Sequence, residues 1–201
     1  MLKSLPTRPL ALGIALAGGL GLSQAALAQG AVAKHVGAPA PVVMHQITEA
    51  EVLAAQRAWG EALVQISKDY ETAGLAKAKA TAAAVLDAAY GYQYGPVLFK
   101  PTLTTAPQTF RTTREGALAY FVGDNKHFPD DKGFALRGWR SVEVRNVALQ
   151  LHGDTALSMG NVMLTDKSGT VTTVDKTWGY VRDDKGALRI VLHHSSLPVS
   201  K

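Results

Sequence analysis

The last third of this 201-residue chain consists of four alternating apolar and polar stretches separated by very short turns. The stretches cover residues 141–152, 156–165, 170–182 and 188–196, and the turns read GD, DKSG and DDKG. Strands joined by turns this short pair with their neighbours in antiparallel order. In the first stretch the alternation slips by one residue between Val144 and Val147. The pattern therefore predicts a four-stranded antiparallel meander with one irregularity.

The preceding residues show helical rather than strand periodicity. Thr48 and Glu51 in the sequence TEAE form a capping box, in which each side chain bonds the other residue's backbone N–H. Apolar residues then recur at helical spacing and predict a helix over 48–72. Gly74 interrupts this period, and an alanine-rich second helix is expected over 75–90.

Two shorter elements are expected between these helices and the meander. VLFK at 97–100 predicts a strand that ends at Pro101. TTRE at 112–115 predicts a second capping box, which opens a helix running to about Phe121. Helices first and strands afterwards indicate the α+β class, here a single domain over 47–201. We expect a curved antiparallel sheet packed on the N-terminal helices, forming a cone with an internal pocket.

The first 28 residues have the composition of a secretory signal peptide. Lys3 and Arg8 precede a short apolar run, and the segment ends in ALA at 26–28. Cleavage after Ala28 would lower the formal charge from +5 to +3 by removing Lys3 and Arg8. Residues 29–46 are rich in Ala, Pro and Gly and predict a flexible lead-in. We expect a periplasmic protein with no membrane association after cleavage; the alternative is an uncleaved anchor.

Composition excludes several classes of chemistry. The chain has no cysteine, which rules out thiolate nucleophiles, zinc–thiolate sites and iron–sulfur clusters. Its positive charge is mild and no run of Lys and Arg is present, so nucleic acid is not an expected partner.

The sequence HHSS at 193–196 places polar groups at the end of an apolar strand. Side chains alternate along a strand, so His193 and Ser195 share one face and His194 lies on the other. Two adjacent histidines on opposite faces cannot both reach one metal ion unless the strand is bulged, and no H-x-H or H-E-x-x-H spacing is present. His193 and Ser195 could position a small polar molecule, or they could be buried strand-end residues. A serine nucleophile is disfavoured because no G-x-S-x-G motif occurs.

Several stretches together resemble the iota-class carbonic anhydrases over about residues 46–198. They are AAQRAWG (54–60), GYQYGPVLFKPT (91–102), TREGALAYFVG (113–123), GFAL (133–136), ALSMGN (156–161), GYVR (179–182) and HHSSLP (193–198). The resemblance implies reversible hydration of carbon dioxide to bicarbonate and a proton. It also implies a cone-shaped fold like that of nuclear transport factor and the calmodulin-kinase association domain, and a homodimer.

The family's pocket implies roles for four residues of this chain. Thr102, Tyr120 and Ser195 would hold the water or bicarbonate, and His193 would take or relay the proton. Family members have been described both as metal-free and as zinc- or manganese-dependent. The strand alternation and the scarcity of other histidines favour a metal-free site here, with no cofactor.

Four apolar residues are expected to line this pocket. They are Phe99, Phe121, Trp178 and Leu192, which would admit carbon dioxide and exclude bulk water. Thr102 could instead be a loop cap, and Tyr120 a core residue. The same fold also allows a non-catalytic periplasmic module that binds a small ligand or drives oligomerisation.

Overall fold

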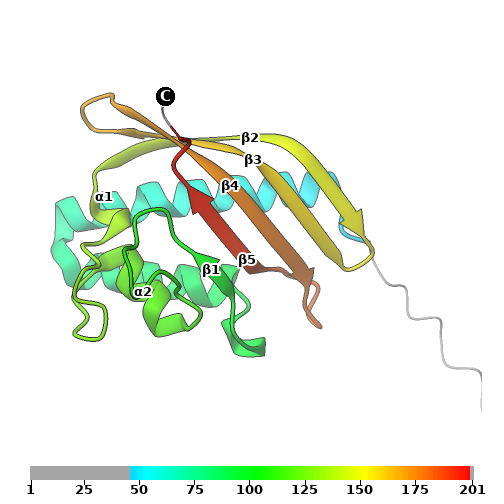
Figure 1. Ribbon diagram of the computed structural model, residues 1–201, viewed down its shortest axis with the longest axis horizontal. Helices are drawn as coiled ribbons and strands as arrows, with labels where there is room; N and C mark the ends of the chain where they lie inside the picture. Colours follow the sequence, from blue (N-terminus) through cyan, green and yellow to red (C-terminus); the bar gives the residue numbers. More distant parts are fainter. Residues whose placement is uncertain (1–45, 200–201) are drawn as a thin grey trace, which may run out of the picture. The chain divides into compact units, whose positions relative to one another are not determined.

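The four predicted long strands are present in the computed structural model, which describes residues 46–199 (Figure 1). The elements are α1 (Glu49–Ala89), η1 (Tyr92–Tyr94), β1 (Leu98–Lys100), α2 (Arg114–Val122), η2 (Phe134–Leu136), β2 (Trp139–His152), β3 (Thr155–Asp166), β4 (Val171–Arg182) and β5 (Leu188–Ser196). The fold is α+β, as expected. The predicted signal peptide lies outside the described residues, as does nearly all of the predicted lead-in.

The sheet has the order β1-β5-β4-β3-β2, and β1 runs parallel to β5. The expectation of a purely antiparallel sheet was therefore wrong for this edge strand. The alternation of residues predicts that a strand exists, but not the direction of a partner far away in the chain. The pairing matters because it sets Phe99 opposite His193, and so brings the chain after Pro101 to the end of β5.

The N-terminal helix α1 crosses behind the four long strands in Figure 1 and covers their inner face. The capping box is present: Thr48 N donates to Glu51 Oε2 at 2.8 Å, and Glu51 N donates to Thr48 Oγ1 at 3.3 Å. Gly74 interrupts the helix with φ 79°, in the left-handed region that glycine adopts without strain. The predicted break is thus a kink between two helical segments. The second predicted cap is displaced by one residue, because Thr113 rather than Thr112 caps α2.

The start of α1 is tied to the end of β4 by an ion pair. Glu51 Oε1 accepts from Arg182 Nη2 at 2.8 Å. The Thr48 backbone N–H and then the Arg182 side chain lower the pKa of Glu51 from 4.5 to about 2. A carboxylate with a lowered pKa stabilises the folded state above its unfolded pKa, and this contribution is lost as the pH falls through its folded pKa.

We expect Glu51→Gln to lower the free energy of unfolding at pH 7 by about 0.5–1 kcal/mol, a modest value because the carboxylate is partly exposed. The difference from the wild type should shrink as the pH falls from about 4.5 towards 2. Urea unfolding at pH 7 and at pH 3 measures it, with Glu49→Gln in the same helical turn as the control. A deficit of equal size at both pH values would contradict the ion-pair explanation.

Three register shifts interrupt the pairing of the long strands, and the first lies between Trp139 and Ser141 at the start of β2. The register of β2 on β3 shifts between Asn146 and Ala148, which is the slip predicted from the sequence. The register of β4 on β5 shifts between Gly179, opposite Leu192, and Tyr180, opposite Ile190. Val191 is therefore an extra residue in β5, and the alternation changes face there. Ile190 and His193 are consequently both buried on the inner face.

Candidate active site

Two hydroxyl groups meet where β1 and β5 end. Thr102 Oγ1 and Ser195 Oγ lie 2.7 Å apart. Ser195 is buried, whereas Thr102 is half-buried in the loop that follows β1. Lys100 Nζ donates to the Ser195 backbone carbonyl at 3.3 Å and does not contact the Ser195 hydroxyl. The parallel strand pairing thus joins two of the predicted site residues, which lie 93 positions apart in the chain.

A third hydroxyl, that of Tyr120, comes from α2. Its ring stacks on Phe134 with centroids 5.4 Å apart and meets the edge of Phe99 at 5.7 Å. Its Oη is buried beside Leu103 and Thr102 and makes no hydrogen bond to any described residue. Burial raises the pKa of Tyr120, partly offset by Leu103 and Thr102, so the phenol keeps its proton at neutral pH. An unpaired buried donor is costly unless a ligand accepts from it.

Tyr120 also lines a hollow of about 240 Å³ that opens to the surface. Leu103, Phe134 and Arg137 form other parts of its wall. The hollow gives a small molecule access to Tyr120.

His193 lies beneath these hydroxyls in an aromatic cage. Its ring centroid lies 4.2 Å from that of Phe99 and 6.2 Å from that of Trp178. Its Nδ1 lies 2.8 Å from Tyr90 Oη, and its Nε2 contacts Lys176 Nζ. Burial holds the pKa of His193 well below its ordinary value. His193 is therefore neutral, and both of its nitrogens are engaged.

Lys176 is the main functional candidate that the sequence analysis missed. It is 4% exposed, and its Nζ lies 3.4 Å from Ser195 Oγ. The amine also lies over the rings of Trp59 and Trp178, 4.7 and 5.1 Å from their centroids. Burial lowers the pKa of Lys176 well below its usual value. A sequence signal existed, because Lys176 and Trp178 occupy alternate positions in β4 and so share a face.

Three of the four residues predicted to line the pocket belong to the group of aromatic rings around His193. Phe99 lies 5.9 Å from Phe121 between ring centroids, and Trp178 lies near His193. Leu192 is not in it: it packs near Gly179 on the outer face, opposite Leu98, which is 62% exposed. The expectation that Leu192 lines the pocket does not fit this placement, because Leu192 and His193 are adjacent in β5 and strand alternation puts them on opposite faces.

The remaining histidines of the described region lie elsewhere. His194 and His152 are exposed, and His127 pairs with Glu115 at 2.9 Å on the surface. Within residues 46–199 no group of three or more His, Asp or Glu side chains is placed to hold a metal ion. The same residues contain no helix long and apolar enough to cross a bilayer.

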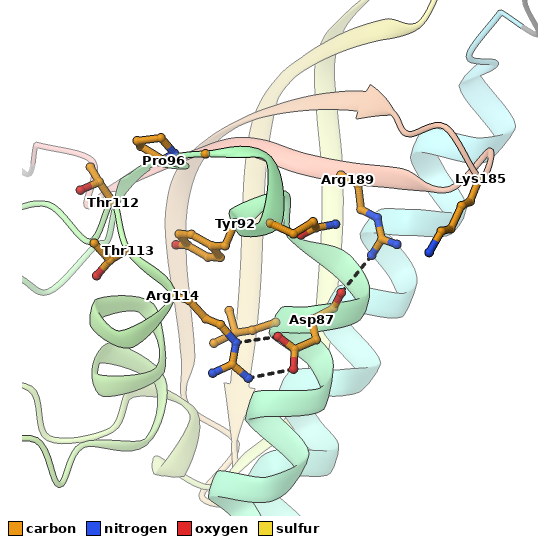
Figure 2. Close-up of a pocket in the computed structure, with 11 residues that line it drawn as sticks. Asp87, Tyr92, Pro96, Thr112, Thr113, Arg114, Lys185 and Arg189 are labelled. Atoms are coloured by element: carbon orange, nitrogen blue, oxygen red, sulfur yellow. Dashed lines mark hydrogen bonds and ion pairs between the residues drawn. The ribbon is translucent and has the colours of Figure 1, made fainter.

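A larger surface groove, of about 620 Å³, lies between the end of α1 and the start of α2 (Figure 2). It contains none of the predicted site residues. Its Arg114 forms a two-point ion pair with Asp87, and Arg189 pairs with Asp183. These cations already have acidic partners, so the smaller hollow at Tyr120 is the better candidate for the active site.

A long helix packs against a curved sheet in an α+β cone, and three hydroxyls and a buried histidine gather at one end of the sheet. The family model for metal-independent carbonic anhydrases matches residues 50–197. The chain therefore belongs to the metal-independent carbonic anhydrase family.

Two relatives agree with this assignment. A metal-independent carbonic anhydrase from Nostoc sp. is 66% identical over 158 residues, which cover 79% of this chain and 77% of the relative. A crystal structure of a cyanobacterial iota-carbonic anhydrase in complex with bicarbonate is 63% identical, with a TM-score of 0.78. It covers 82% of this chain and all of that one.

Proposed function

We propose that this chain catalyses the reversible hydration of carbon dioxide to bicarbonate and a proton at Thr102, Tyr120 and Ser195. Membership of the metal-independent family supports the activity and the absence of a metal cofactor. The observation that carries the assignment of the site is the hydroxyl pair 2.7 Å apart beside the unpaired Tyr120 Oη. The bicarbonate complex of the cyanobacterial relative supports a substrate of this size and charge.

The three hydroxyls act by position and by hydrogen bonding. Free water has a pKa of about 15.7 and is a poor nucleophile. Holding it beside carbon dioxide in attack geometry can supply up to about 7–11 kcal/mol of the barrier. Tyr120 aims a donor at the oxygens that become negative, and one such donor contributes about 3 kcal/mol in other enzymes. The rings of Phe99, Phe121 and Trp178 keep bulk water from the site.

Stopped-flow hydration assays on the full chain test this function, before and after exhaustive chelation and with the metal content measured in parallel. We expect activity that survives chelation without stoichiometric metal. Activity that is lost and then restored by zinc or manganese would refute the metal-free mechanism. A folded but inactive protein would favour the alternative of a non-catalytic binding or oligomerisation domain.

We also propose that the protein is a homodimer, formed through the outer face of the sheet. Leu98, Val147, Leu157 and Met159 leave between 40% and 81% of their surface exposed. Apolar residues gathered on one sheet face suit a second copy of the same face. Light scattering should give a dimer for the wild type and a monomer for Met159→Glu. A monomeric wild type would refute the proposal.

Export to the periplasm is proposed from residues 1–28 alone. Their basic start, apolar middle and ALA end suit the secretory pathway. In a Gram-negative host we expect periplasmic protein that begins at Gln29. Retention of the intact N-terminus in the cytoplasm would refute this localisation.

A further inference from the structure

The hydrogen bonds that join Trp59, Tyr90 and His193 have donors and acceptors that the side-chain chemistry determines. An indole N–H can only donate, and Trp59 Nε1 donates to Tyr90 Oη at 3.0 Å. The hydrogen of the Tyr90 hydroxyl then needs an acceptor, and His193 Nδ1 lies 2.8 Å away. Tyr90 therefore donates to Nδ1. Burial raises the pKa of Tyr90 and keeps this proton in place.

This direction determines the state of the next two groups. With Nδ1 accepting, neutral His193 carries its proton on Nε2. The Nε2 atom contacts Lys176 Nζ, so the Nε2–H bond points at the amine. An ammonium has no lone pair to accept that hydrogen, whereas a neutral amine has one. The chain from Trp59 to His193 thus favours Lys176 as a neutral amine in the resting protein.

The surroundings of Lys176 can also hold a proton after it arrives. Its Nζ lies over the faces of Trp59 and Trp178, and ring faces attract a cation within about 6 Å. Ser195 Oγ lies 3.4 Å from Nζ and 2.7 Å from Thr102 Oγ1, so the amine connects to the pocket through two hydroxyls. Among the described residues, His193 hydrogen-bonds Tyr90 and Lys176, and Lys176 links it to the hydroxyl pair.

We propose that Lys176 takes up the proton released by carbon dioxide hydration, acting through Ser195 and Thr102. This inference rests on the proposed function and changes the role of His193. His193 does not receive the proton from the site directly; it positions the amine and keeps it unprotonated before each turnover.

The proton transfer is balanced without another reactant. The water oxygen bonds to the carbon of carbon dioxide, and one water proton moves to Thr102 Oγ1. Thr102 passes its own proton to Ser195 Oγ. The Lys176 amine turns its lone pair from the His193 Nε2–H bond to Ser195 Oγ, and Ser195 passes its own proton to that lone pair. The products are bicarbonate, two restored hydroxyls and an ammonium, which exchanges its hydrogen bond to His193 for the two indole faces. After bicarbonate leaves, the ammonium returns its proton to water through the same hydroxyls.

Lys176→Met is the direct test, with Lys100→Met as the matched control. Both lysines reach Ser195, but Lys100 contacts only its backbone carbonyl. We expect Lys176→Met to lower kcat by at least about 100-fold, the usual contribution of a general base. The KM for carbon dioxide should change little, because the amine does not touch the substrate. Lys100→Met should keep the wild-type rate.

The pH profile supplies a readout that a merely structural role would not move. A base must be unprotonated, so wild-type kcat/KM for hydration should rise with pH through a value below the ordinary 10.5 of lysine. Tyr90→Phe removes the donor to Nδ1 and lets His193 accept at Nε2, which favours the ammonium. The rise in kcat/KM should then move to higher pH. Tyr92→Phe is the control: the Tyr92 hydroxyl donates to the Arg111 carbonyl, and its removal should leave the pH of the rise unchanged.

Each outcome separates the two proposals. An active wild type whose Lys176→Met variant keeps more than a third of the rate overturns the role of Lys176 and leaves the proposed function intact. A folded wild type without hydration activity overturns both. If Lys176→Met fails to fold, the pH profile of Tyr90→Phe tests the role of Lys176 instead. A rise in kcat/KM at the same pH as in the wild type overturns the inference.

Discussion

Replacing Ser195 by alanine is expected to lower kcat for carbon dioxide hydration by about 10²–10³-fold, the usual cost of removing one hydroxyl or amide that stabilises a transition state. The change removes the partner that lies 2.7 Å from Thr102 Oγ1 and 3.4 Å from Lys176 Nζ. Thr102 then loses its fixed orientation, and the route from the pocket to the buried amine is broken. Stopped-flow hydration assays measure the effect.

The neighbouring serine provides a matched control. Ser196 follows Ser195 in β5 and, by strand alternation, faces the other side of the sheet. Ser196→Ala should keep the wild-type rate, and both variants should unfold at wild-type temperatures to within a few degrees. A Ser195→Ala variant as active as Ser196→Ala would show that the hydroxyl pair is not the site of reaction.

The largest effect on stability is expected at a buried ion pair beside Tyr120. Arg111 and Asp131 are joined by two hydrogen bonds of 2.8 Å, and their side chains are 2% and 3% exposed. Arg111→Met should lower the free energy of unfolding by about 3–5 kcal/mol, because it leaves a buried carboxylate without its partner. Denaturant unfolding monitored by tryptophan fluorescence measures the loss.

Two further variants test this reason. Arg111→Met combined with Asp131→Leu should be more stable than Arg111→Met alone, because no buried charge is left unpaired. Arg145→Met breaks an ion pair whose side chains are 71% and 58% exposed, and should leave the free energy of unfolding nearly unchanged. Equal losses for Arg111→Met and Arg145→Met would contradict the argument from burial. Asp131 also lines the hollow at Tyr120, so the pair supports the wall of the active site.

Local rules were enough to predict most elements of this fold. The capping box at Thr48 depends on contacts within four residues, and the kink at Gly74 depends on one residue's freedom to adopt a positive φ. The slip in β2 was visible because apolar residues changed parity around Val147. Each of these features is written in consecutive residues and needs no information about distant parts of the chain.

Predictions that needed a distant partner were less complete. The direction of β1 depends on its pairing with β5, and a strand of three residues carries no signal for that choice. Leu192 was assigned to the pocket, although alternation alone had already separated it from His193. The bulge at Val191 then placed Ile190 on the same face as His193 and left Leu192 outside. A bulge depends on the register between two strands, which one strand's sequence does not show.

By itself, the sequence determined the α+β class, the order of the helices and strands, and the family. These follow from short-range periodicity, caps, turns and distinctive motifs. Only the tertiary structure decided that Thr102 meets Ser195 and that Lys176 stands between Ser195 and His193. The physical reason is that the state of a buried amine is set by the groups packed around it. Here those groups come from α1, β4 and β5, which only the folded sheet brings together.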